Sequence, residues 1–164
     1  MNRNIILLII FFFIPFKAIA SIDFAIVDLD FLLKSSKKGL KIQKEYKETN
    51  EKNIKNFIKK EKVLKEKENA IKSKKNVLSE EDFKKEVLEF SEEVKKYNQE
   101  KNKIIDELNK KRNSEIVKLL KNINSILVDY AKENNISTTL DKKYVIMTKS
   151  ENDITQAILD ILNK

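Results

Sequence analysis

Aspartates near the two ends of the chain are the residues whose type and spacing come closest to a catalytic arrangement. Asp28 and Asp30 are two positions apart, as in a pair of carboxylates that act as general acid and base. Asp28 lies at the end of a predicted strand and Asp30 is the predicted cap of a short helical turn. No other reactive side chain accompanies them, so we interpret both as structural. Asp141 and Asp153 are interpreted in the same way, as a turn residue and a helix cap.

The composition removes further kinds of chemistry. The chain has no histidine, which is the commonest general base and metal ligand, and it has no cysteine. The sequence contains neither a phosphate-binding loop nor a cluster of metal-ligating residues. We therefore predict that the protein is not an enzyme, with no catalytic residue, no metal site and no cofactor.

Lysine dominates the first predicted long helix. Residues 34–76 contain 16 Lys and 6 Glu, a net charge of +10, whereas residues 80–134 are close to neutral. Three interpretations of the basic span stay open. The first is a solvated helix face. The second is a surface that attracts polyanions or acidic unfolded proteins. The third is a helix that binds nucleic acid with strongly salt-dependent affinity.

The first 20 residues have the pattern of an export signal. Arg3 gives a positive start, residues 5–16 are apolar apart from Pro15, and Ala18-Ile19-Ala20 is an A-x-A cleavage site. A membrane-spanning helix needs roughly 20 apolar residues, so cleavage after Ala20 is favoured over anchoring. We predict an exported protein, for which nucleic acid is not the expected partner in the cell.

Few turns are expected in the rest of the chain, because Gly39 is the only glycine and Pro15 the only proline. Heptad-like apolar spacing predicts two long helices, with Ser79 as the N-cap of the second and a stutter through Arg112. Two long helices joined by a short turn predict an antiparallel coiled-coil hairpin. This arm spans residues 34–135, and its tip lies near residues 71–79.

Short strands are predicted at both ends of the chain. Residues 24–27 are all apolar, and residues 136–140 and 144–147 flank a tight turn, before a last helix capped by Asp153. These strands are expected to form one small sheet, in which residues 24–27 pair near Val145 and Met147. Residues 21–33 and 136–164 would then form a body, whose candidate contact residues are Phe24, Ile26, Val27, Leu140, Val145 and Ile146.

The predicted body is too small to be stable alone. Three short strands bury little apolar surface, and their exposed edges need partners. The sequence therefore predicts an oligomer held together by the body.

Three segments resemble the Skp/OmpH family of periplasmic chaperones. They are FAIVDLDFLLKSSKKG (24–39), LSEEDF (78–83) and TLDKKYVIMTKSENDITQAILDIL (139–162), in that order. The resemblance implies a mainly α protein with a small β base, assembled as a homotrimer whose helical arms surround a cavity like tentacles. It also implies a holding chaperone for unfolded outer-membrane and envelope proteins that needs no ATP. An anionic lipid surface is a further partner proposed for the family.

Candidate client-binding residues follow from this expectation. Phe57 and Ile58 are adjacent, so both cannot face the seam between the helices, and Val77 and Leu78 are apolar residues at the tip. The basic candidates nearby are Lys59, Lys60, Lys72, Lys74 and Lys75. The alternative to a chaperone is a structural coiled-coil spacer or envelope-tethering protein, which would share the arm but would not need the terminal sheet.

Overall fold

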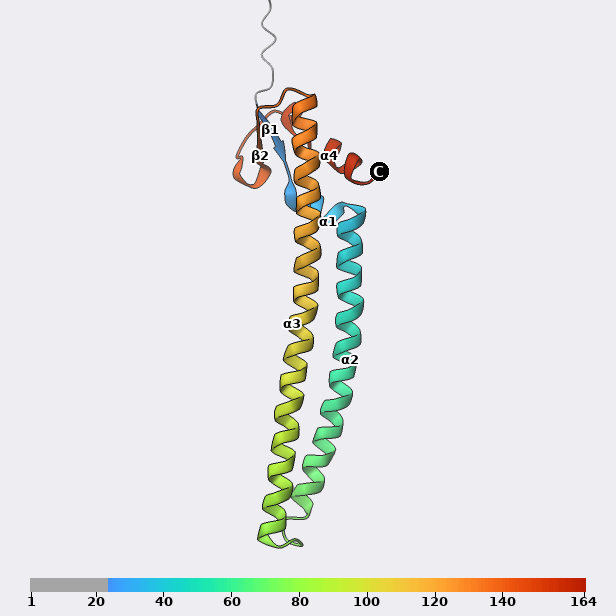
Figure 1. Cartoon of the computed structure of the whole chain (residues 1–164), viewed down its shortest axis with the longest axis vertical. Helices are drawn as coiled ribbons and strands as arrows, with labels where there is room; N and C mark the ends of the chain where they lie inside the picture. The colour runs from blue at the N-terminus through green and yellow to red at the C-terminus, as the bar shows by residue number, and fades with distance from the viewer. Residues whose placement is uncertain (1–23) are drawn as a thin grey trace, which may run out of the picture.

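The computed structural model describes residues 24–164, so the predicted signal peptide and its cleavage after Ala20 lie outside the described residues. Strand β1 (Phe24–Val27) leads into helix α1 (Leu29–Ser35). Two long helices follow, α2 (Lys37–Ser73) and α3 (Glu80–Glu133). Strand β2 (Thr138–Asp141), two short 3₁₀ helices (Lys142–Tyr144 and Ser150–Asn152) and helix α4 (Thr155–Leu162) complete the chain. Figure 1 shows the long helices extending away from a small group of elements formed by both ends of the described chain.

The sheet of the described chain consists of β1 and β2, which run parallel, with Phe24 opposite Thr138 and Val27 opposite Asp141. On the other edge of β1, Ile26 forms a bridge with Asp153, and the Ile154 N–H donates to the Ile26 carbonyl at 2.9 Å. Both edges of β1 are therefore occupied within one chain. The meeting of segments from the two ends was predicted correctly.

The predicted strand at residues 144–147 is wrong for the described chain, and so is its pairing with residues 24–27. Tyr144 ends a 3₁₀ helix, and Val145 to Met147 form a loop with a bend at Ile146. The Asp141 carboxylate accepts from the Lys143 N–H at 3.3 Å, which turns the chain here instead of the predicted tight hairpin. Because β2 and Asp153 already occupy the two edges of β1, residues 144–147 cannot pair with β1.

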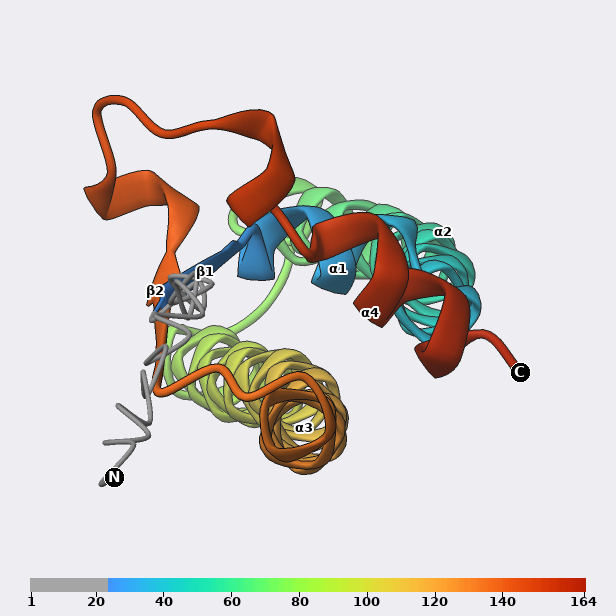
Figure 2. The same ribbon diagram turned by 90° about the horizontal axis from the view of Figure 1, so that it is seen from above.

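The buried core lies at the sheet end of the molecule. Ala25 and Val27 from β1, Leu32 from α1, and Ile158 and Leu159 from α4 pack together. They meet residues of the long helices, namely Ile42, Leu119, Ile123 and Leu127. Figure 2 shows α1 and α4 lying near the end of α3 in the view from above. The core therefore includes the last turns of α3 as well as both chain ends, and we call it the terminal core.

The break between α1 and α2 lies at Ser36, because its extended backbone ends one helix and its side chain caps the next by accepting from the Gly39 N–H at 3.1 Å. Gly39, the only glycine of the chain, does not make this break, since it lies inside α2. A Cβ at this position would lie 1.9 Å from the Leu33 carbonyl oxygen. Glycine therefore permits α1 and α2 to approach closely.

Two predicted helix caps are also displaced. Asp28, and not Asp30, caps α1, because its carboxylate accepts from the Phe31 N–H at 2.8 Å. At α4 the N-cap position is Ile154, one residue after the predicted Asp153. Asp153 still accepts from the Thr155 N–H at 3.0 Å, and it also accepts from the Lys142 ammonium at 2.8 Å.

Helices α2 and α3 lie side by side along most of α2 (Figure 1). Ser79 caps α3 as predicted, since its hydroxyl accepts from the Asp82 N–H at 3.2 Å. Lys74 pairs with Glu86 at 2.8 Å, and Lys60 pairs with Glu100 at 3.0 Å. Later residues of α3 therefore lie opposite earlier residues of α2. At the other end of α2, the Lys37 N–H donates to the Asn163 side chain, and the Lys37 ammonium donates to the Asn163 carbonyl, both at 2.8 Å. These bonds fix the start of α2 to the end of α4.

Candidate functional site

The adjacent residues Phe57 and Ile58 are separated by the packing of α2. Phe57 is half-buried toward α3, where the Lys101 ammonium lies 5.4 Å from the centre of its ring. Ile58 is 60% exposed. Of the two candidates, Ile58 is therefore the one available to a partner.

The candidate lysines differ in how freely their charge acts. Ion pairs hold three of them: Lys60 with Glu100, Lys74 with Glu86, and Lys72 with Glu68 at 2.5 Å. Lys59 and Lys75 form no ion pair with any residue of the described chain, 24–164. The positive charge near the tip is therefore weaker than the composition of residues 34–76 predicts, and Lys59 and Lys75 are the unpaired lysines among the candidates.

The turn between α2 and α3 lies farthest from the terminal core (Figure 1). The N–H groups of Val77 and Leu78 both donate to the Lys74 carbonyl, at 2.9 and 3.0 Å, so the turn is compact. Leu78 is half-buried beneath it, whereas the Val77 side chain is 82% exposed. The turn therefore presents one apolar side chain next to the unpaired Lys75.

A polar cluster of Glu61, Tyr97 and Lys101 interrupts the seam midway along the helix pair. The Tyr97 hydroxyl donates to the Glu61 carboxylate at 2.8 Å, and the Lys101 ammonium donates to the same oxygen at 2.7 Å. The hydrogen bond from Lys101, and then that from Tyr97, lowers the pKa of Glu61. Burial raises the pKa of Tyr97 to about 12, with a contribution from its hydrogen bond to Glu61. Near neutral pH the carboxylate is therefore charged and the phenol neutral, and the cluster cross-links the two helices.

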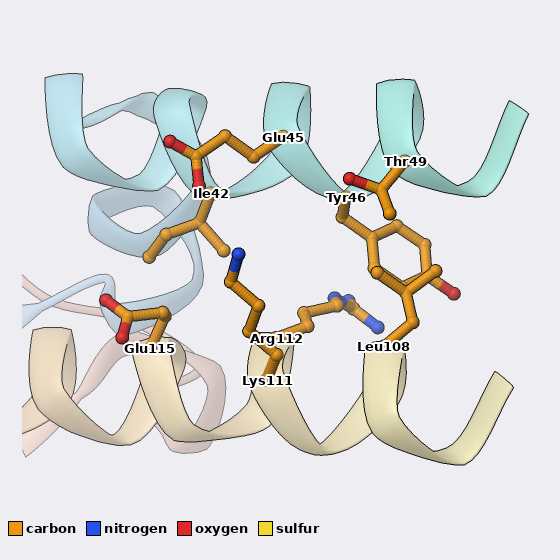
Figure 3. Close-up of a pocket in the computed structure, with 8 residues that line it drawn as sticks. All are labelled: Ile42, Glu45, Tyr46, Thr49, Leu108, Lys111, Arg112 and Glu115. Atoms are coloured by element: carbon orange, nitrogen blue, oxygen red, sulfur yellow. The ribbon is translucent and has the colours of Figure 1, made fainter. Parts of the chain in front are cut away.

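A groove lies where α1, α2 and α3 meet, close to the terminal core. The residues that line it include Leu33, Ile42 and Leu119 together with Tyr46 and Arg112. The Arg112 guanidinium lies 5.1 Å from the centre of the Tyr46 ring. Figure 3 shows the Lys111 and Arg112 side chains extending from α3 toward α2 in the adjoining part of this groove. The sequence marked Arg112 only as a stutter in the heptads, although it is the only arginine after Arg3.

The predicted body residues divide into a buried and an exposed set. Val27 is buried in the terminal core, Ile26 is fully buried outside that cluster, and Val145 is half-buried. Phe24 and Leu140 are partly exposed, and Ile146 is fully exposed. The body candidates did not include Tyr144 and Met147, which are 80% and 87% exposed. Tyr144, at the end of a 3₁₀ helix, and Ile146 and Met147, in the loop after it, are exposed apolar residues of one short segment, and we call this set the loop surface.

Within residues 24–164 there is neither a group of three or more metal-ligating side chains nor a helix that is long and apolar enough to cross a membrane.

Comparisons with known proteins give one family and one fold. The sequence profile of the family described as Outer membrane protein (OmpH-like) matches residues 23–162. No curated protein matches the chain. Among solved structures, the chain is similar to an OmpH-like protein from Caulobacter crescentus CB15, provisionally described as an outer membrane chaperone. The TM-score is 0.78 at 14% sequence identity, and the match covers 86% of this chain and 83% of the other. At this identity, the structural likeness establishes the fold.

Proposed function

Because the chain belongs to the OmpH-like outer membrane protein family, we propose that it is a periplasmic chaperone that holds unfolded outer-membrane and envelope proteins. Such clients carry apolar side chains and unpaired strand edges, and they aggregate in water when nothing separates them. Holding them needs no covalent chemistry and no ATP. The proposed protein is therefore a binding device and not an enzyme.

The observation that carries this proposal is a long, charged helix pair that ends in an exposed apolar turn. The 54 residues of α3 correspond to about 80 Å at 1.5 Å per residue. Ile58 and Val77 are exposed on the pair, and Lys59 and Lys75 add unpaired positive charge. A few separated apolar contacts hold an unfolded chain weakly at several points without imposing one structure on it.

We further propose that the protein is a homotrimer, with residues 34–135 as a hairpin arm and residues 21–33 and 136–164 as the body. The loop surface supports this assembly, because several exposed large apolar side chains on one short segment are typical of interfaces. The outer edge of β2 is a second candidate contact, since β1 occupies only one side of it. Three arms around a cavity would exclude other chains from a bound client.

Clients would be captured by weak contacts and released to a partner that binds them more tightly, such as the outer membrane or its assembly machinery. Unpaired lysines attract acidic segments over about 8 Å at physiological ionic strength. The same charges would attract an anionic lipid surface, which would place the chaperone where its clients are delivered.

Light scattering of the purified protein, with and without an unfolded outer-membrane barrel protein, tests this function. The expected result is a trimer that keeps the barrel protein soluble at close to one trimer per client. An assembly of the right size that leaves the barrel protein to aggregate would instead favour a spacer or tether.

A further inference from the structure

We propose that the groove between α1, α2 and α3 binds a carboxylate attached to an apolar side chain, and that its occupant is the C-terminal residue of an unfolded polypeptide. The choice of a polypeptide rests on the proposed function. The chemistry of the ligand rests on the groove itself, which lies apart from the tip and from the loop surface.

The floor of the groove is apolar. Ile42 and Leu119 are buried in the terminal core, and Leu33 and Ile116 are half-buried beside them. The space above them has a volume of about 530 Å³. A large apolar side chain would gain free energy by leaving water here and by covering the exposed parts of Leu33 and Ile116.

The rim of the groove carries an excess of unpaired positive charge. Lys34 and Arg112 line the groove itself, and neither forms an ion pair with any residue between 24 and 164. Asp30 is the one acidic residue of the same lining, so the charges of that lining sum to +1. In the adjoining part, Lys111 is accompanied by Glu45, which lies 3.9 Å from Lys41, and by Glu115, which lies 2.6 Å from Lys118. The groove itself therefore complements a single negative charge.

Arg112 is the side chain best suited to hold that charge. A guanidinium presents two parallel N–H donors to a carboxylate, which an ammonium cannot do. Every other cationic side chain in residues 24–164 is a lysine, so arginine is exceptional at this position. Tyr46 lies against the guanidinium, and its own hydroxyl donates to Asn109 at 3.2 Å, so the stacked ring is held in place (Figure 3).

A labelled ten-residue peptide that ends in phenylalanine tests the proposal, by fluorescence anisotropy with the full-length protein. The peptide is made with a free C-terminal carboxylate and as the C-terminal amide. Amidation and the substitution Arg112→Gln should each weaken binding on the order of tenfold, because each removes a charge-assisted pair of hydrogen bonds. Arg112→Lys should bind with intermediate affinity. The matched control is Lys110→Gln, which removes the same charge two residues before Arg112. Lys110 does not line the groove, so this variant should change the affinity by less than about twofold.

Equal affinity for the acid and amide peptides would overturn the proposal, and so would unchanged binding by Arg112→Gln. If a saturated fatty acid binds through Arg112 and the peptide does not, the groove belongs to a lipid and the proposal also fails.

The same variants in the aggregation assay separate this inference from the proposed function. If the parent protein keeps the barrel protein soluble but binds no peptide, the groove proposal alone is wrong. If the peptide binds through Arg112 and the barrel protein still aggregates, the holding function is wrong and the carboxylate site stands.

Discussion

Gly39 lies where the start of α2 passes closest to α1, and its lack of a side chain decides whether the two helices fit. In a helix interior, replacing glycine with alanine usually stabilises a protein by about 0.5–1 kcal/mol. Here the added Cβ would lie 1.9 Å from the Leu33 carbonyl oxygen, so α1 must move. We expect Gly39→Ala to lower the free energy of unfolding by about 1–3 kcal/mol. Denaturant unfolding at fixed protein concentration measures this, with Lys38→Ala at the neighbouring exposed position as the control. A more stable Gly39→Ala variant would show that α1 and α2 separate easily.

Tyr97 has a pKa that pH titration can isolate. Burial, and then the hydrogen bond to Glu61, raises it to about 12 from the ordinary 10. A raised folded-state pKa means that this contribution to stability is complete below about pH 10 and is lost as the pH rises toward 12. Ultraviolet titration should show one of the four tyrosines ionising late, and Tyr97→Phe should remove that step. Glu61→Gln should move the step to lower pH, and a late step that survives Tyr97→Phe would assign it to another tyrosine.

Among the elements, local signals in the sequence predicted helices better than strands. The Ser79 cap and the acidic turn after it depend on neighbouring residues, so they could be read directly from the sequence. Residues 144–147 have an apolar, strand-like pattern, but whether they pair depends on the edges of β1, which distant β2 and Asp153 occupy. The candidate site divides in the same way. The exposure of Val77 at the turn was predicted from its place between the two helices. The groove beside Tyr46 and Arg112 forms only where three helices meet, and its one sign in the sequence is the heptad stutter at Arg112.

The length of the helix pair should be separable from the terminal core. Residues 65–71 and 89–95 face each other, as the Lys67–Glu93 ion pair between them shows. Deleting both segments should shorten the pair by about 10 Å, because seven helical residues rise roughly 10.5 Å. The terminal core lies outside both segments, so its stability and the oligomeric state should not change. Small-angle scattering measures the length and light scattering the mass. Loss of the oligomer would mean that the helices themselves hold the copies together.

For the whole molecule, the loop surface gives a direct test of assembly. Ile26 is fully buried, so a charge there would unfold the chain and could not report on contacts between copies. Ile146 and Met147 are exposed in the single chain, so Ile146→Asp with Met147→Asp should leave the fold intact. We expect this double variant to sediment as a helical monomer, by analytical ultracentrifugation with circular dichroism. The control is Val77→Asp at the distant turn, which should keep the parent mass. A double variant with the parent mass would place the interface elsewhere.

Unpaired charge should govern how quickly the whole molecule captures a client. Exposed charges steer encounters through a screened field and affect association more than residence time. Lys59 and Lys75 are the unpaired lysines among the candidates, so Lys59→Gln with Lys75→Gln should slow capture at low salt by roughly twofold or more. Lys121→Gln with Lys132→Gln removes the same net charge from the opposite end of α3 and should slow capture less if clients first meet the turn. At about 0.5 M salt, where the Debye length is about 4 Å, all three proteins should capture at similar rates. Stopped-flow fluorescence of a labelled unfolded barrel protein across a salt series gives these rates.

A parent capture rate that does not depend on salt would leave apolar contact and exclusion by the arms as the means of capture. Equal slowing of the two double variants would show that the net charge of the protein matters more than the position of the charges.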